Sequence, residues 1–212
     1  FPTRRSSDLD SEKTRQKAFG IVQKQIEAAH LLGAKTILVV PGYVGCNFVE
    51  HPEKIRYDIA YERAQDALSR LAPEAKAADV AIGIENVWNR FLLSPLETRR
   101  FLDEIGSDYV GMYLDVGNAV YIGYPEQWIE ILGHRIKKLH MSDYRFDQAG
   151  IGAFVDLFAG DVDFPAVAKA IAGIGYDDYI TLEMLPNYKQ FPEVSLYADK
   201  FAMNKIIEMI HL

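Results

Sequence analysis

The sequence lacks several features that would point to particular classes of protein. It has a single cysteine, Cys46, which excludes an internal disulfide and fits a reducing compartment. No apolar run approaches the roughly 18–20 residues that a membrane-spanning helix needs, and no secretory signal stands at the start. We therefore expect a cytoplasmic protein without a membrane partner.

Basic residues are fewer than acidic residues. The chain has 23 Lys and Arg against 30 Asp and Glu, a net charge of −7, and no basic patch stands out. Nucleic acid is therefore not an expected partner. No GxGxxG or P-loop pattern follows any apolar run, which argues against a dinucleotide-binding or phosphate-loop fold.

What the chain does contain is an alternation of short apolar runs and helix-like stretches. Its 212 residues are 49% hydrophobic, which is enough for one sizeable core. The β-branched and aromatic runs predict five buried strands: Thr36–Val40, Val80–Glu85, Val110–Asp115, Ile136–His140 and Tyr179–Glu183. Helical periodicity and capping residues predict six helices: Ser11–Leu32, Tyr57–Ala78, Ser94–Ile105, Pro125–Leu132, Asp163–Ile174 and Val194–Ile210.

This alternation predicts an α/β fold with parallel strands, as in part of a (β/α)8 barrel with about five of the eight βα units. A doubly wound open sheet is the rival, and the missing glycine-rich motifs count against it. We expect a break or kink at Pro73 inside the second helix. The segment Tyr144–Gly160 is predicted to be a long loop. Loops of this length are often functional, so we expect this one to contribute to the function.

The first stretch, FPTRRSSDL (Phe1–Leu9), is interpreted as a non-native tail. It has no helix or strand period, and it can be back-translated into a string that resembles a sequencing-library adapter. The alternative is a disordered basic tail. We expect Asp10–Leu212 to form one domain that lacks its N-terminal strands, and the natural protein to begin upstream.

Four of the predicted strands end in a residue that can bind a metal. These are Glu85, Asp115, His140 and Glu183. Any one of them alone has an ordinary structural explanation, such as a rim charge or a core histidine. Because parallel strands carry their carboxyl ends to one edge, we expect the four side chains to converge. Three carboxylates and an imidazole suit Mn²⁺, Mg²⁺, Co²⁺ or Zn²⁺.

The motifs around these residues resemble the sugar-phosphate isomerase/epimerase family of the xylose-isomerase-like barrels. That family includes ketose 3-epimerases, L-ribulose-5-phosphate 3-epimerases and hexulose-6-phosphate isomerases. The matching motifs are IENVWNRFLLSP, YLDVGNAVYIGYPEQW, KLHMSDY, GDVDFPAV and YITLEM. The resemblance implies a TIM barrel of which strands four to eight are retained, and a divalent metal held by Glu85, Asp115, His140 and Glu183.

The resemblance also implies a reaction. Glu85 and Glu183 would be catalytic acid/base groups as well as ligands, while Asp115 and His140 would mainly hold the metal. A carboxylate would remove a proton next to a carbonyl, and the metal would stabilise the enediolate. Carboxylates on both sides of the sugar would give epimerisation, whereas one base on one face would give aldose–ketose isomerisation.

Substrate-binding residues are expected near these ligands: Trp88, Asn89, Asn118, Asp143 and Arg145. Trp88 and Asn89 would form a wall of the pocket, Asp143 would orient a ligand or bind a hydroxyl, and Arg145 would bind a phosphate or another substrate oxygen. Some ketose 3-epimerases carry a histidine where this chain has Asn118. That difference favours the branches that act on phosphorylated sugars.

Three alternatives stay open. A metal-dependent dehydratase of the inosose or 3-dehydroshikimate type would use the same fold and the same enolisation. A truncated barrel could be inactive. A DNA-repair endonuclease would need a histidine-rich multi-zinc cluster and a basic surface, and the sequence has neither. The sequence leaves open which sugar is used, whether it is phosphorylated, which metal binds, and whether the protein forms a homo-oligomer.

Overall fold

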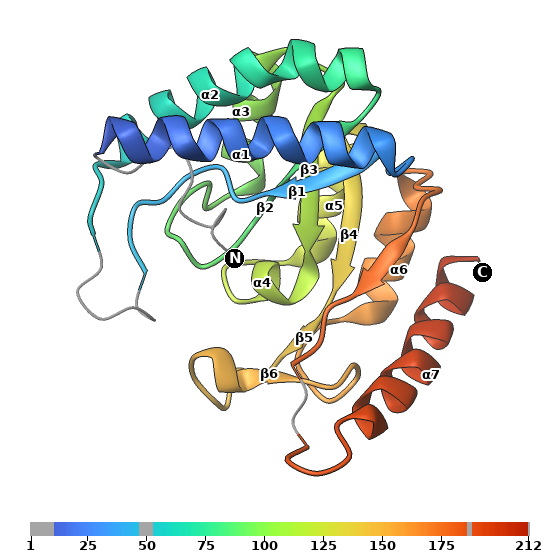
Figure 1. Ribbon diagram of the computed structural model, residues 1–212. Coiled ribbons are helices and arrows are strands. Elements are labelled where there is room, and N and C mark those ends of the chain that lie inside the picture. The colour runs from blue at the N-terminus through green and yellow to red at the C-terminus, as the bar shows by residue number, and fades with distance from the viewer. Residues whose placement is uncertain (1–10, 47–52, 186–187, 212) are drawn as a thin grey trace. The chain divides into compact units, whose positions relative to one another are not determined.

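The computed structural model describes residues 11–46, 53–185 and 188–211 (Figure 1). The predicted tail, Phe1–Leu9, lies outside the described residues. Within them, each of the five predicted strands has a counterpart whose ends differ by at most one residue from those expected. The sheet order is β1 (Thr36–Val39), β2 (Ala81–Glu85), β3 (Val110–Asp115), β4 (Ile136–Met141) and β7 (Ile180–Leu182). The pairs β1–β2, β2–β3 and β4–β7 are parallel, as expected for part of a barrel.

All six predicted helices are also present. They are α1 (Glu12–Leu31), α2 (Tyr57–Ala78), α3 (Pro95–Ile105), α5 (Pro125–Leu132), α6 (Phe164–Gly173) and α7 (Glu193–Ile210). Local capping sets their ends. The Ser94 hydroxyl accepts a hydrogen bond from the Glu97 amide at 3.2 Å, and Gly106 ends the same helix in the left-handed conformation. No helix in the described ranges is long and apolar enough to span a membrane.

Of the break or kink expected at Pro73, the break is wrong, because α2 is helical from Tyr57 to Ala78. Proline removes one backbone donor and crowds the preceding turn, but tertiary packing can outweigh that penalty. Here Leu71, Ala72 and Ala75 on either side of the proline are buried, whereas Pro73 itself is exposed. The apolar face of α2 therefore keeps the helix continuous.

The chain divides into two compact units, which are described separately. The first comprises residues up to Tyr113 together with Arg135–Lys137. In it, α1 packs on α2 and β1, and α2 packs on β2 and α3. The fully buried ring of Phe101 makes edge-to-face contacts with Tyr61 and Phe91, at centroid distances of 5.0 and 6.0 Å. These rings anchor α3 to α2.

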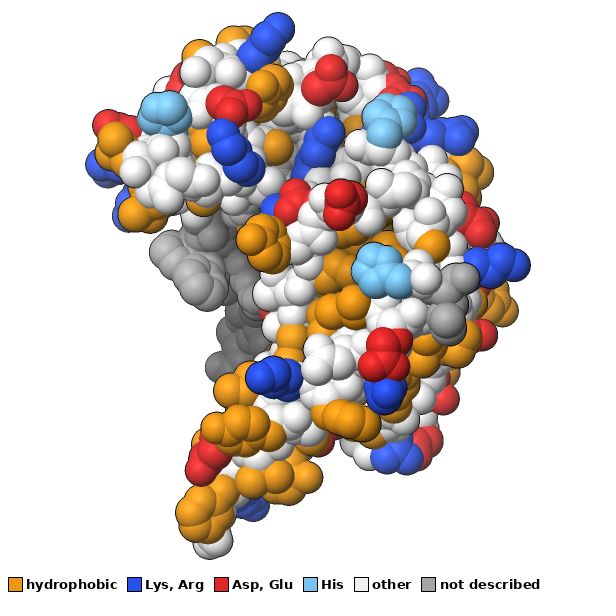
Figure 2. Space-filling model, turned by 90° about the vertical axis from the view of Figure 1, so that its right-hand side faces the viewer, with side chains coloured by type: hydrophobic (Ala, Val, Ile, Leu, Met, Phe, Trp, Pro, Cys, Tyr) orange, Lys and Arg blue, Asp and Glu red, His pale blue; other side chains and the backbone are white. Residues whose placement is uncertain are grey.

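The second unit comprises residues 114–134 and 138–212. Here α5 packs against α6, and α6 against α7, over buried side chains that include Trp128, Leu132 and Phe164 (Figure 1). Figure 2 shows hydrophobic side chains gathered on the face that α7 contributes, where Tyr197 and Phe201 are exposed. Thus α7 is apolar on its outward side as well as on its packed one.

The predicted loop Tyr144–Gly160 is wrong in part, since it contains structure. A two-stranded antiparallel ribbon joins β5 (Asp143–Tyr144) to β6 (Phe154–Val155). The buried ring of Tyr144 contacts the rings of Phe154 and Tyr121 at centroid distances of 5.3 and 5.5 Å. Strands of two residues carry no alternating pattern, so the sequence could not reveal them.

Candidate metal centre

The ends of the strands bring ionisable side chains together, and the strand register explains how. In the pairing of β4 with β7, Met141 lies opposite Leu182, and the Glu183 amide donates to the Met141 carbonyl at 2.9 Å. Glu183 therefore follows the last paired residue of β7 beside the end of β4, which carries His140. Asp115 is the last residue of β3. In the pairing of β2 with β3, Glu85 lies opposite Tyr113, two residues before Asp115.

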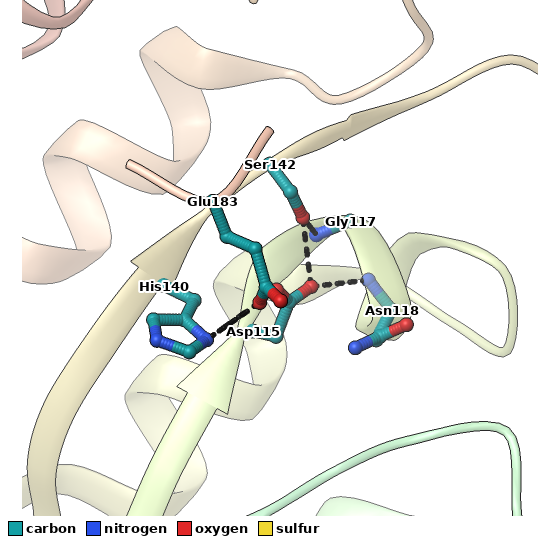
Figure 3. A network of polar contacts seen from close by, with 6 residues as sticks. All are labelled: Asp115, Gly117, Asn118, His140, Ser142 and Glu183. Atoms are coloured by element: carbon teal, nitrogen blue, oxygen red, sulfur yellow. Dashed lines mark hydrogen bonds and ion pairs between the residues drawn. The ribbon is translucent and has the colours of Figure 1, made fainter. Parts of the chain in front are cut away.

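Asp115, His140 and Glu183 form a compact cluster in the second unit (Figure 3). His140 Nδ1 lies 2.7 Å from Glu183 Oε2 and 3.9 Å from Asp115 Oδ2. Asp115 and His140 are buried, whereas the Glu183 side chain is 42% exposed. The cluster thus has an open side at Glu183.

The structure brings three of the predicted ligands together within the second unit. One ligand atom each of Asp115, His140 and Glu183 lies within 4.8 Å of the others. Donors on opposite sides of a divalent cation, each about 2.0–2.6 Å from it, are separated by about 4–5 Å. The spacing of these two carboxylates and one imidazole therefore fits such an ion. Glu85, the fourth predicted ligand, is the last residue of β2 in the first unit.

The Asp115 carboxylate is held in one orientation by neighbouring donors. Its Oδ1 accepts hydrogen bonds from the Asn118 amide at 2.6 Å and from the Ser142 hydroxyl at 2.8 Å (Figure 3). The first of these bonds makes Asp115 the N-cap of the short helix α4 (Val116–Val120). With Oδ1 occupied in this way, Oδ2 is the oxygen that faces His140.

Neither α4 nor Ser142 was predicted from the sequence. A five-residue helix is too short for a periodic signal, although an aspartate three residues before Asn118 is a local N-cap pattern. Ser142 is two residues past His140, and residues two apart on an extended segment point to the same side. From this spacing, the sequence could have indicated that the Ser142 side chain points to the same side as His140.

Asn89, a predicted substrate-binding residue of the first unit, holds the backbone around it in place. The buried Asn89 side chain donates from Nδ2 to the Gly42 carbonyl and accepts from the Phe91 amide at 3.2 Å. Asn89 ties the segment after β1 to the one after β2, and it lines a small pocket together with Glu85. Trp88 is partly buried beside it.

In the second unit, Arg145 directly follows β5 of the ribbon, and Asn118 lies in α4 beside Asp115. The Arg145 guanidinium forms an ion pair with Asp147 at 2.8 Å and is 40% exposed. The Asn118 side chain is partly exposed, and its backbone amide bonds to Asp115 as described above. The structure leaves both side chains enough exposed surface to contact a substrate.

Asp143 has a role that the sequence did not predict. Its buried carboxylate accepts hydrogen bonds from the amides of Tyr144 at 2.9 Å, Gly160 at 2.8 Å and Val162 at 3.2 Å. Burial raises the pKa of Asp143, against the lowering effect of these amides. Asp143 therefore fastens the two ends of the Tyr144–Gly160 segment together. Both of its oxygens accept these amide hydrogen bonds, and a contact between Asp143 and a substrate hydroxyl stays a prediction.

The fold agrees with comparisons to known proteins. Residues 3–203 match the family described as xylose isomerase-like TIM barrel, and the chain belongs to that family. It is 27% identical over 190 residues to an uncharacterized protein of Methanocaldococcus jannaschii, covering 84% of this chain and 61% of that protein. It is 28% identical over 128 residues to an L-ribulose 3-epimerase of Mesorhizobium japonicum, covering 58% of this chain and 40% of the relative.

Among solved structures, the IolI protein with a bound zinc atom is similar, with a TM-score of 0.79. The sequences are 20% identical, and the match covers 95% of this chain and 72% of that one. This likeness is one of fold. The chain spans about three fifths of the length of the Methanocaldococcus relative.

Proposed function

We propose that this chain carries the active site of a divalent-metal-dependent isomerase or epimerase acting on a ketose or a sugar phosphate. The observation that carries the proposal is the cluster of Asp115, His140 and Glu183, with His140 Nδ1 2.7 Å from Glu183 Oε2. Membership of the xylose isomerase-like family and the relative named L-ribulose 3-epimerase support this reaction class.

In this proposal the metal ligands are Glu85, Asp115, His140 and Glu183. Asp115 and His140 are buried and are suited to holding the ion in place. A bound Mn²⁺, Mg²⁺, Co²⁺ or Zn²⁺ would supply Lewis-acid polarisation of a substrate carbonyl. His140 would bind such an ion through a ring nitrogen that carries no proton, so metal affinity would fall at low pH.

The proton transfers are assigned to the two glutamates. Glu183 is partly exposed on the open side of the cluster, where a bound sugar can reach its carboxylate. We propose that Glu183 removes the proton next to the carbonyl as a general base. Glu85, at the end of β2, is the proposed partner that returns a proton to the other face of the enediolate. With both glutamates active the product is an epimer, and with one active on a single face it is an isomer.

The substrate class in this proposal is a pentulose or hexulose, with phosphorylated sugars favoured. Arg145 is the candidate that binds the phosphate. Its guanidinium is 40% exposed, and its ion pair with Asp147 lies at the surface. Asn118 and Asn89 offer amide groups to substrate hydroxyls, and Trp88 offers an apolar wall. These four residues are the proposed specificity determinants.

Deuterium exchange tests the reaction class directly. The protein is incubated in D₂O with Mn²⁺ or Mg²⁺ and a panel of pentuloses, hexuloses and their phosphates, and NMR follows the carbon next to the carbonyl. Two-base epimerisation places one deuteron at C3 of the product, and one-base isomerisation places label at C1 or C2. A dehydratase would instead release water and yield a conjugated product that absorbs in the ultraviolet.

The matched samples contain EDTA or the Glu183→Gln variant, and exchange should stop in both. The Glu130→Gln variant is the control, because Glu130 is an exposed residue of α5 and should leave exchange unchanged. Absence of metal-dependent exchange across the whole panel, with ketoses and cyclic polyol ketones included, would overturn the proposed function.

A further inference from the structure

We infer that Ser142 is a positioning residue for the metal centre, and that Gly117 is required for it to act. Together they fix which oxygen of Asp115 faces the ion. The inference rests on the proposed function, because it concerns the same cluster. It adds two residues that are not among the predicted metal ligands or substrate-binding residues.

The direction of the hydrogen bonds carries the first step. The Gly117 amide donates to Ser142 Oγ at 3.1 Å, so the serine hydroxyl acts as an acceptor there. The serine proton is then donated to Asp115 Oδ1 at 2.8 Å. The Asn118 amide donates to the same oxygen at 2.6 Å. Two donors therefore meet on Oδ1 and occupy both of its lone pairs.

The second step is the rotation of the carboxylate. Asp115 is 1% exposed, so water cannot replace a lost hydrogen-bond donor without a local rearrangement. With both donors present, Oδ1 is fixed at the start of α4 and Oδ2 faces His140. Without the serine hydroxyl, Oδ1 keeps the N-cap bond but loses one of these two donors, and the carboxylate is less restrained about its terminal bond. A turn about this bond moves Oδ2 away from the position of a ligand.

The third step explains the glycine. A Cβ atom at position 117 would lie 2.3 Å from Ser142 Oγ, 3.1 Å from the Ser142 carbonyl carbon and 3.2 Å from Phe154 Cε1. Gly117 is the second residue of α4, where alanine would otherwise be favoured over glycine by helix propensity. The close approach of Ser142 therefore explains why this position is glycine.

A double-mutant cycle on metal binding tests this arrangement. Isothermal titration with Mn²⁺ measures the affinity of the wild type, Ser142→Ala, Gly117→Ala and the double variant. Removal of a group that orients a ligand typically weakens metal binding by about 10–100-fold. We expect a loss in that range for Ser142→Ala, and a loss of similar size for Gly117→Ala, because the new methyl group displaces the hydroxyl.

The double variant separates a shared action from two independent ones. In the Ser142→Ala background the 2.3 Å clash partner of the methyl group is gone, and the remaining contacts require shifts of only a few tenths of an ångström. The second substitution should then weaken binding by less than about threefold, which makes the two effects strongly non-additive. Ser69→Ala, at an exposed position of α2, is the control and should bind Mn²⁺ like the wild type.

The outcomes distinguish this inference from the proposed function. If the wild type binds Mn²⁺ and Ser142→Ala binds it equally well, the positioning role is wrong and the proposed function stands. Additive losses in the cycle would refute the coupling to Gly117. A lower melting temperature with unchanged Mn²⁺ affinity would make Ser142 merely structural. If the wild type binds no divalent metal, the proposed function fails, and the inference that rests on it fails as well.

Discussion

His140 Nδ1 lies 2.7 Å from Glu183 Oε2, close enough for the two groups to share a proton or to bind one cation. The two residues are 43 positions apart in the chain, yet the pairing of β4 with β7 makes them neighbours. The proposed chemistry depends on this proximity of His140 and Glu183, because one cation must contact both side chains.

Metal binding should stabilise the fold, because the ligands come together only in the folded chain. At a hundredfold excess over its dissociation constant, Mn²⁺ should add about 2.7 kcal/mol to the free energy of unfolding. The melting temperature should rise by several degrees and fall again when EDTA is added. His140→Ala and Glu183→Gln should each lose most of this rise. The exposed Glu130→Gln substitution should retain it.

Asp143 should matter for stability and little for metal affinity. Asp143→Ala leaves the amides of Tyr144, Gly160 and Val162 without their acceptor in a buried place. We expect a loss of roughly 2–4 kcal/mol in urea unfolding. Asp147→Ala removes an exposed aspartate from the same segment and should change stability by less than about 0.5 kcal/mol. A neutral result for Asp143→Ala would mean that other contacts hold the segment.

Asp199 should make the stability of the protein depend on pH. This buried residue of α7 accepts a hydrogen bond from the Leu157 amide at 2.8 Å, and its Oδ2 is buried without a hydrogen-bond partner among the described residues. Burial raises the pKa of Asp199, the Leu157 amide lowers it, and the nearby Asp156 raises it further. A carboxyl whose pKa is higher in the folded state binds more protons there. Asp199 therefore contributes to the free energy of unfolding at low pH, and this contribution is lost as pH rises through its pKa in the folded state.

The Asp199→Asn variant removes this titration. It should melt at a higher temperature than the wild type at pH 7, and the difference should shrink as pH falls toward about 4, the unfolded pKa of an aspartate. Asp177→Asn, at an exposed position of the same unit, is the control and should show no such trend. Parallel melting curves for the wild type and Asp199→Asn at all pH values would contradict the prediction.

Pro73 should be a destabilising residue that α2 tolerates. Replacing it with alanine restores a backbone donor in the middle of a continuous helix, and Pro73 is exposed, so little packing is lost. We expect Pro73→Ala to raise the free energy of unfolding by about 1–3 kcal/mol. Pro95 stands at the first position of α3, where its missing amide proton has no helical partner. Pro95→Ala should therefore change stability by less than about 0.5 kcal/mol. Equal effects at both sites would refute this account.

The strands and the helix ends could be predicted because their signals are local. The run VGMYLD is recognised as a strand from its own apolar residues, without reference to the rest of the chain. Ser94, Pro95 and Gly106 set the ends of α3 through contacts within a few residues. The break expected at Pro73 failed because burial of Leu71 and Ala75 on both sides outweighs the local penalty. The ribbon of β5 and β6 was missed because its pairing joins segments too short to show a period.

The sequence by itself determined which donors the candidate centre contains, since Glu85, Asp115, His140 and Glu183 stand at the ends of strands that their own residues define. It also determined the family, through motifs that extend over most of the chain. Tertiary structure alone decided how those donors are oriented. Ser142 meets Asp115 across 27 residues, and Gly117 lets them meet because it has no side chain to intervene. Such contacts depend on strand register and on close backbone approach, and neither leaves a periodic pattern in the sequence.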